Sequence, residues 1–302
     1  MQPRPPASAY AAAIAMPFAF GMSFVATKYA LRGFEPLLVA LLRFTLAGAI
    51  LWVLLRLRRE REPVTQRDLG RLALMGFVSL TVYFSFENSG IARTSASQAA
   101  ILIATIPIFV AVLNVFTLRE PMAVRQWAGV ALSFAGIVAL VCFGGQSSAG
   151  SVGGDLLVLA ASLAAAVYSI MARSLLLERS ALSVTAYQNL FGAAFMLPLA
   201  LVEAALVGVR RPTADAVGGV LFLTVMCSVV AYLLLNYAFR FIEASRLSVF
   251  INLTPIVGVG FAFLVLGERF TGAQAAAAVV VVLGVWLTNT GSRAAARSPS
   301  AG

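Results

Sequence analysis

The chain contains no histidine, one lysine and two cysteines, and only 11% of its 302 residues are charged. Without histidine, it lacks the commonest metal ligand and proton shuttle. Cys142 and Cys227 both lie inside apolar runs, so they predict neither a disulfide framework nor a metal site. No GxxxxGK[ST] pattern occurs, which argues against direct use of ATP. The acidic residues are scattered, so we expect no enzyme active site and no cofactor.

Apolar residues, in contrast, make up 61% of the chain, and the mean hydropathy is +0.93. A bilayer core about 30 Å thick takes roughly 20 apolar residues per helix. The chain supplies ten such runs, which predicts an all-α polytopic membrane protein with ten transmembrane helices. The expected spans are 10–31, 36–55, 72–91, 95–118, 126–143, 155–177, 182–206, 217–239, 244–266 and 271–290.

The formal net charge of +10 comes from arginines that gather between the apolar runs. With the N-terminus placed in the cytoplasm, 15 basic residues fall on the cytoplasmic side and six on the other side. Short cytoplasmic loops of membrane proteins carry such an excess of basic residues. We therefore expect a multi-pass protein of the cell (inner or plasma) membrane with both termini cytoplasmic. Its expected partners are lipid and a small molecule, not nucleic acid.

One pattern of residues occurs twice, at an offset of 148 positions. Internal repeats of this kind define the architecture before any single residue is interpreted. Each copy holds five spans, and because five is odd the second copy enters the membrane from the opposite side. We therefore expect two five-helix inverted repeats, a common basis for alternating access in transporters. The identities are Asn88, Ala96-Ser97, Pro107-Ile108, Leu118, Glu120, Gln126 and Gly136, matched by Asn236, Ala244-Ser245, Pro255-Ile256, Leu266, Glu268, Gln274 and Gly284.

The same pattern divides the chain. We expect a first five-helix repeat over 1–143, a Gly/Ser-rich linker over 144–154, a second repeat over 155–290 and a disordered tail over 291–302. The linker is flexible by composition.

Two prolines, Pro107 and Pro255, lie near the middle of equivalent spans. A proline inside a helix has no N–H and clashes with the carbonyl group four residues earlier. A free carbonyl group is costly in lipid, so these kinks should face protein or a water-filled cavity. The pair predicts two symmetric hinges beside the transport pathway, and a static kink is the alternative.

Three charged residues fall inside the spans at similar depth: Lys28, Arg43 and Glu87. A charge at the centre of a helix costs about 2.5–3.5 kcal/mol on insertion scales, so each one needs a partner or a cavity. Glu87 is placed to neutralise one of the two cations, which predicts a gate near the extracellular side. A static ion pair between helices is the alternative. Glu87 is also the candidate for proton coupling, and whether protons take part stays open.

Uncharged polar residues recur on single faces of several spans. In the span 217–239, Ser228, Tyr232 and Asn236 are four residues apart, so they share one helical face. We expect these faces to converge on a substrate cavity, although polar residues also link helices for about 0.6 kcal/mol each. The predicted cavity residues are Tyr83, Asn88, Tyr168, Gln188, Tyr232, Asn236 and Asn252.

Glu120 and Glu268 lie at equivalent turns, and each precedes the start of a helix. We expect each acid to cap the helix that follows it. The spans 126–143 and 271–290 are rich in Ala, Gly and Val, which permits close helix packing within the chain or between chains.

The repeated pattern resembles the EamA-type transporters of the drug/metabolite transporter superfamily. The resemblance rests on Pro107 to Gly136 and its copy Pro255 to Gly284, with Phe20-Gly21, Ser23, Lys28, Pro36, Arg43 and Asn88 in support. It implies ten helices and the transport, usually the export, of small metabolites such as amino acids. Around Met22 the chain departs from the pattern, because the usual aromatic residue is replaced.

Together these features predict a secondary or facilitative exporter of small organic metabolites, with amino acids first. The alternative is uptake or exchange of a phosphorylated sugar or nucleotide-sugar. A transporter of such a substrate would favour more than the two embedded cations of this chain. A channel would need a ring of charge or a filter-like loop, and the sequence shows neither.

Overall fold

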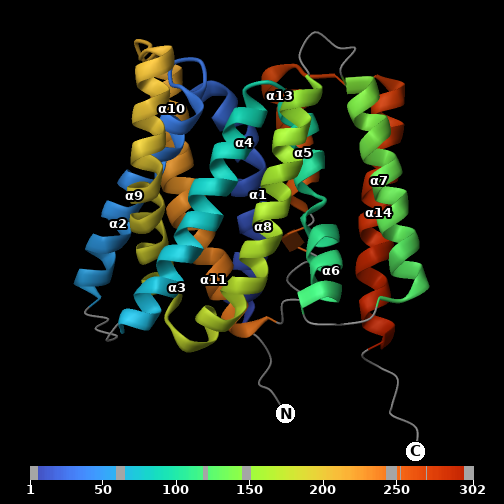
Figure 1. Ribbon diagram of the computed structural model, residues 1–302, viewed down its shortest axis with the longest axis horizontal. Helices are drawn as coiled ribbons and strands as arrows, with labels where there is room; N and C mark the ends of the chain where they lie inside the picture. The colour runs from blue at the N-terminus through green and yellow to red at the C-terminus, as the bar shows by residue number, and fades with distance from the viewer. Residues whose placement is uncertain are drawn as a thin grey trace, which may run out of the picture.

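The computed structural model describes residues 6–58, 65–117, 122–144, 151–242, 250–251, 253–269 and 271–295. Every regular element in these ranges is helical (Figure 1). The elements are α1 (Ala7–Ala30), α2 (Pro36–Leu57), α3 (Gln66–Gly76), η1 (Phe77–Val82), α4 (Tyr83–Ile91), α5 (Ala96–Ile103), α6 (Ile106–Thr117), α7 (Val124–Gly144), α8 (Val152–Glu178), α9 (Ala181–Val207), α10 (Ala214–Phe222), η2 (Leu223–Ala231), α11 (Tyr232–Phe241), α13 (Leu253–Leu266) and α14 (Gly272–Ala295).

These elements form the ten predicted spans, and the prediction of an all-α polytopic fold is confirmed. Eight spans are long and apolar enough to cross a membrane, and two shorter apolar helices cover Leu253–Leu266 and Gly272–Thr288. The third span begins at Gln66, earlier than expected, because Thr65 and Asp68 form a capping box. In that box the Asp68 N–H donates to the Thr65 hydroxyl, and the Thr65 N–H donates to the Asp68 carboxylate. A polar first turn therefore extends the helix beyond its apolar run.

Helix packing follows the inverted repeat. α2 packs against α9 and α7 against α14, which are equivalent spans of the two halves. α1 packs against α13, and α8 packs in the same way against α5 and α6. α1 begins and α14 ends on one side of the bundle, which we call the terminal face (Figure 1). The other side is called the opposite face.

The α7–α14 pair lies at one end of the bundle and packs through small residues (Figure 1). A Cβ atom added at Gly136 would meet the Val281 backbone nitrogen at 2.7 Å. Gly129 is as tight, since its Cβ would lie 2.6 Å from the Thr288 backbone nitrogen. The small faces thus bring two helices of the same chain together.

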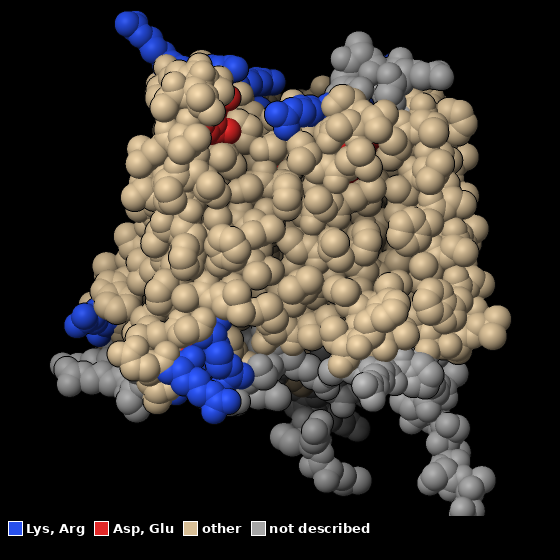
Figure 2. All heavy atoms as spheres, in the orientation of Figure 1, with Lys and Arg blue, Asp and Glu red and all other residues tan. Residues whose placement is uncertain are grey.

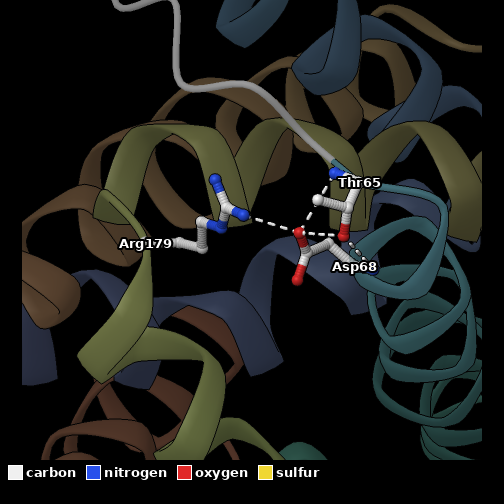
Figure 3. Close-up of polar contacts among 3 residues, drawn as sticks. All are labelled: Thr65, Asp68 and Arg179. Carbon is white, nitrogen blue, oxygen red and sulfur yellow. Dashed lines mark hydrogen bonds and ion pairs between the residues drawn. The ribbon is translucent and has the colours of Figure 1, made fainter.

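Charges gather at both faces and leave an uncharged band between them in the view of Figure 2. This is the surface that a bilayer requires, because a charge in hydrocarbon is costly. On the terminal face Arg179 donates to the Asp68 carboxylate at 2.6 Å, and the Thr65 hydroxyl donates to the same oxygen (Figure 3). This contact ties the start of α3 to the turn between α8 and α9.

On the opposite face, carboxylates of the second half cap helices of the first half. Glu268 accepts hydrogen bonds from the backbone N–H groups of Ala96 (2.9 Å) and Ser97 (2.8 Å), the first residues of α5. Glu203 of α9 accepts in the same way from Leu37 and Leu38, at the start of α2. Both carboxylates satisfy N–H groups that have no partner within their own helix.

The prediction that Glu268 caps the helix that follows it is therefore wrong, because Glu268 caps α5 instead. The helix that follows it, α14, is capped by Thr271 and Gln274, each of which accepts from the other's backbone N–H. Gln126 reaches back to the N–H of Ala123 before α7 in the same way, which gives the repeated glutamine a structural reason. Glu120 lies outside the described residues.

Candidate functional site

The centre of the site is Arg43, on the third turn of α2. Its side chain is 2% exposed, and its Nε donates to the Ser228 hydroxyl at 2.6 Å. The guanidinium carbon lies 4.6 Å from the centre of the Phe84 ring and 5.3 Å from that of Phe44. Aromatic faces attract a desolvated cation, so these rings offset part of the cost of burial. Ser228 belongs to η2, so this contact joins the two halves.

Glu87 and Tyr83 lie one turn apart on α4, on one helical face. The Tyr83 hydroxyl donates to Glu87 Oε1 at 2.7 Å, and Glu87 is 6% exposed. Arg43 is near enough to act electrostatically on Glu87. Within the described part of the chain, however, no ion pair joins the two side chains. The two charges are thus neighbours, and each is hydrogen-bonded to a hydroxyl group instead of to the other charge.

A second group of polar side chains, which carries no charge, lies nearer the terminal face than the Arg43 cluster. The Gln188 amide donates to the Ser79 hydroxyl at 2.6 Å, which in turn donates to the Met75 carbonyl group. The Tyr168 side chain lies beside Gln188. This group lies between α8, α9 and η1. Tyr168 and Gln188 were predicted to line the cavity, and Ser79 was not.

Tyr232 connects the charged and neutral groups. It is near Tyr168 on one side and near Arg43 and Glu87 on the other. Its ring packs edge-on against Phe20, with the centroids 5.4 Å apart. Tyr83, Tyr168 and Tyr232 are only half-buried although they lie deep in the bundle.

Two spans that contribute side chains to the site change from α-helical to wider π-helical turns. They do so at equivalent places of the two repeats. η1 covers Phe77–Val82, and η2 covers Leu223–Ala231. Position 79 corresponds to position 227 in the repeat, and the polar Ser79 and Ser228 both lie on these turns. Such turns are rare and occur often at functional sites, since they re-aim side chains within a continuous helix. Neither hydropathy nor the repeated pattern predicts these π-helical turns.

The other predicted residues lie elsewhere. Lys28 has Glu268 as its charged neighbour instead of Glu87, so the three predicted gate charges do not form one group. The Asn88 amide donates to the carbonyl group of Pro36 at 3.0 Å and links α4 to α2. The side chain of Asn236 and all of Asn252 lie outside the described residues.

The predicted hinge at Pro107 coincides with a break in the span. α5 ends at Ile103 and α6 begins at Ile106, so Pro107 lies in the first turn of a new helix and not inside a continuous one. The Thr105 hydroxyl and backbone N–H donate to the Leu102 carbonyl group, which also accepts from Ser162. Pro107 therefore occupies a position that needs no N–H. Pro255 is buried within α13, and residue 252, just before the described part of this helix, lies outside the described residues.

Two apolar hollows lie away from this cluster. One, of about 420 Å³, is between α2 and α9 and is bordered by Leu41, Leu46 and Leu197. The other, of about 220 Å³, is bordered by Met22, Phe222 and Phe261. Their lining offers almost no polar group to orient a ligand, so neither is our candidate site.

Sequence reasoning missed one buried carboxylate. Asp155, at the start of α8, is fully buried and accepts from the Thr94 hydroxyl and the Gln98 amide, each at 2.6 Å. The apolar pattern placed it at a span boundary, where acids are ordinarily solvated. It ties α8 to the α4–α5 turn and is separate from the Arg43 cluster.

The fold and the cluster define a class of protein: a multi-pass helical membrane protein of two inverted halves, with polar and charged groups enclosed between them. This is the architecture of secondary transporters. The EamA-like transporter family model matches residues 7–142 and 152–290, and the chain belongs to this family. The resemblance inferred from the repeated pattern is thereby confirmed.

Curated relatives span most of the chain. An uncharacterized transporter from Archaeoglobus fulgidus is 29% identical over 88% of this chain and 92% of its own length. The uncharacterized transporter YcxC of Bacillus subtilis is 30% identical over 92% of this chain and 91% of its own length. A probable terminal-alkyne amino-acid exporter from Streptantibioticus cattleyicolor is 28% identical over 88% of each chain. A protein crystal structure with 20% identity has a TM-score of 0.65, covers 97% of this chain and 99% of its own, and shares the fold.

Proposed function

We propose that this protein exports small organic metabolites, amino acids first, by alternating access across the cell membrane. The observation that carries the proposal is the cluster around Arg43, in which side chains of α2 and α4 from the first half lie beside η2 of the second half. Polar groups in a bilayer interior are costly, so they mark substrate pathways more often than they serve stability. The amino-acid preference takes support from the name of the Streptantibioticus relative.

In this proposal the inverted halves exchange conformations, and the cluster faces one side of the membrane and then the other. The cluster residues come from both halves, so a movement of one half against the other changes their access. Pro107 and Pro255 are proposed hinges for this movement. Both termini are proposed to be cytoplasmic, on the basis of the arginine distribution.

The test is uptake of radiolabelled amino acids, pooled and then single, into proteoliposomes with and without a proton gradient. Saturable flux that empty liposomes lack supports the proposal. Accumulation against a concentration gradient that an uncoupler abolishes indicates proton coupling, and Glu87→Gln should then remove it. No amino-acid flux by protein that keeps its helical circular dichroism would contradict the amino-acid assignment.

The proposed gate has a separate test. If Arg43 and Glu87 close the pathway through their attraction, the two single reversals Arg43→Glu and Glu87→Arg should impair transport and the double variant should restore part of it. A double variant as inactive as the single variants would argue against the gate.

A further inference from the structure

The charges of the Arg43 cluster are only partly satisfied. Arg43 uses Nε for Ser228, and Glu87 uses Oε1 for Tyr83. Among the described residues nothing forms a hydrogen bond or ion pair with the two terminal nitrogens of Arg43 or with Glu87 Oε2. Neither residue is among those with fully buried, unpaired side-chain atoms, so water or a ligand can reach the unused atoms. A charge in the bundle interior is unfavourable unless water or a ligand occupies its unused hydrogen-bonding atoms.

Packing fixes the orientation of both groups. The Arg43 guanidinium is held between the Ser228 hydroxyl and the faces of Phe84 and Phe44. Glu87 is held by the hydroxyl of Tyr83, whose ring packs on Phe84 with centroids 4.6 Å apart. The unused nitrogens form a planar fork, a geometry that matches the two oxygens of a carboxylate. The unused oxygen of Glu87 is an acceptor for a cation such as an ammonium group.

The charge balance limits the ligand further. One cation and one anion make the cluster neutral as a whole. A phosphate-bearing ligand would neutralise Arg43 and leave Glu87 facing added negative charge. A molecule with a carboxylate at one end and an ammonium group at the other satisfies both residues at once. The neighbouring rings of Phe20, Phe84 and Tyr232 offer an apolar wall for its side chain.

We propose that this site binds the zwitterion of an apolar α-amino acid, with Arg43 binding the carboxylate and Glu87, oriented by Tyr83, binding the ammonium group. This assignment rests on the proposed function and adds to it the chemical basis of selectivity. Arg43 and Glu87 then act as specificity-determining residues for the two ends of one substrate.

The experiment measures competition against radiolabelled L-phenylalanine uptake in proteoliposomes. The competitors are L-phenylalaninamide, which lacks the carboxylate, and N-acetyl-L-phenylalanine, which lacks the ammonium group. For the wild-type protein, each blocked analogue should compete at least about tenfold more weakly than phenylalanine, because one charged contact is lost. In Arg43→Gln the disadvantage of the amide should shrink, and in Glu87→Gln that of the acetylated analogue should shrink.

Controls separate this role from a structural one. Arg56→Gln removes an exposed arginine of the same helix and should leave both ratios unchanged. Arg43→Lys keeps the charge without the planar fork and should restore part of the discrimination against the amide. If a variant fails to fold, the wild-type ratios alone still test the assignment.

The possible outcomes are distinguishable. This assignment would be overturned, while amino-acid transport stands, if the blocked analogues compete as well as phenylalanine. The same holds if the Arg43 and Glu87 variants weaken competition by all compounds equally. Transport of polar but not of apolar amino acids would overturn the apolar class. No amino-acid flux by folded wild-type protein would remove the proposed function itself, and this inference with it.

Discussion

Removing the Glu268 carboxylate should weaken the bundle on the opposite face. Glu268 accepts two backbone hydrogen bonds from the start of α5, at 2.9 and 2.8 Å. An N-cap replaced by alanine costs about 0.5–2 kcal/mol, and a hydrogen bond to a charged group contributes about 1.5–3 kcal/mol. Lys28 would lose its charged neighbour as well. We expect Glu268→Ala to lower the free energy of unfolding by about 2–3 kcal/mol.

Two further variants serve as comparisons for the stability of Glu268→Ala. Glu268→Gln keeps one acceptor oxygen without the charge and should cost about 1 kcal/mol. Asp215→Asn removes the Arg32–Asp215 pair on the same face, where the charges are 3.6 Å apart and the two side chains are 52% and 64% exposed. An ion pair so exposed contributes about 0–1 kcal/mol.

Unfolding would be measured in mixed micelles with increasing sodium dodecyl sulfate, followed by helical circular dichroism. The expected order of destabilisation is Glu268→Ala, then Glu268→Gln, then Asp215→Asn. A Glu268→Ala variant no less stable than Asp215→Asn would refute the claim that an acid of the second half caps α5.

Two other predictions follow from the packing. Gly136→Ala should destabilise the protein in the same assay by more than about 1 kcal/mol, since its Cβ would meet Val281 at 2.7 Å; Gly218→Ala, which meets nothing within 4 Å, should be neutral or stabilising. Pro107→Ala and Pro255→Ala should slow transport severalfold while leaving competition by substrate unchanged, because Pro107 starts a helix beside a break and Pro255 holds the equivalent position of the repeat; unchanged transport rates would remove the hinge role.

Hydropathy and the repeat were enough to predict the ten spans and their packing symmetry. Both depend on properties that are local in sequence, namely the length of apolar runs and the parity of spans in each copy. The start of α3 escaped this reasoning because its first two turns contain Arg67, Asp68 and Arg71. A capping box can hold such polar residues in a helix, and hydropathy alone does not weigh it.

The partner of each embedded charge was harder to predict. Lys28, Arg43 and Glu87 have similar depths, but depth does not give the direction in which a side chain points around the helix. That direction depends on the π-helical turns and on the break at 104–105, both of which shift the helical register. Glu268 was visible in the sequence, yet its contact with α5 requires knowing that the two halves meet there.

The repeat itself separates residues of structural and chemical role. Described residues that recur in both copies start, cap or pack helices: Pro107, Gln126 and Glu268 lie at helix starts, and Gly136 allows α7 to pack closely on α14. Arg43 and Glu87 do not recur, since the equivalent positions hold Phe191 and Leu235. A symmetric scaffold needs its helix ends in both copies, whereas one bound molecule with two different ends needs each charged group only once. The asymmetry of the charges within a symmetric fold is therefore what a single substrate site between the halves would produce.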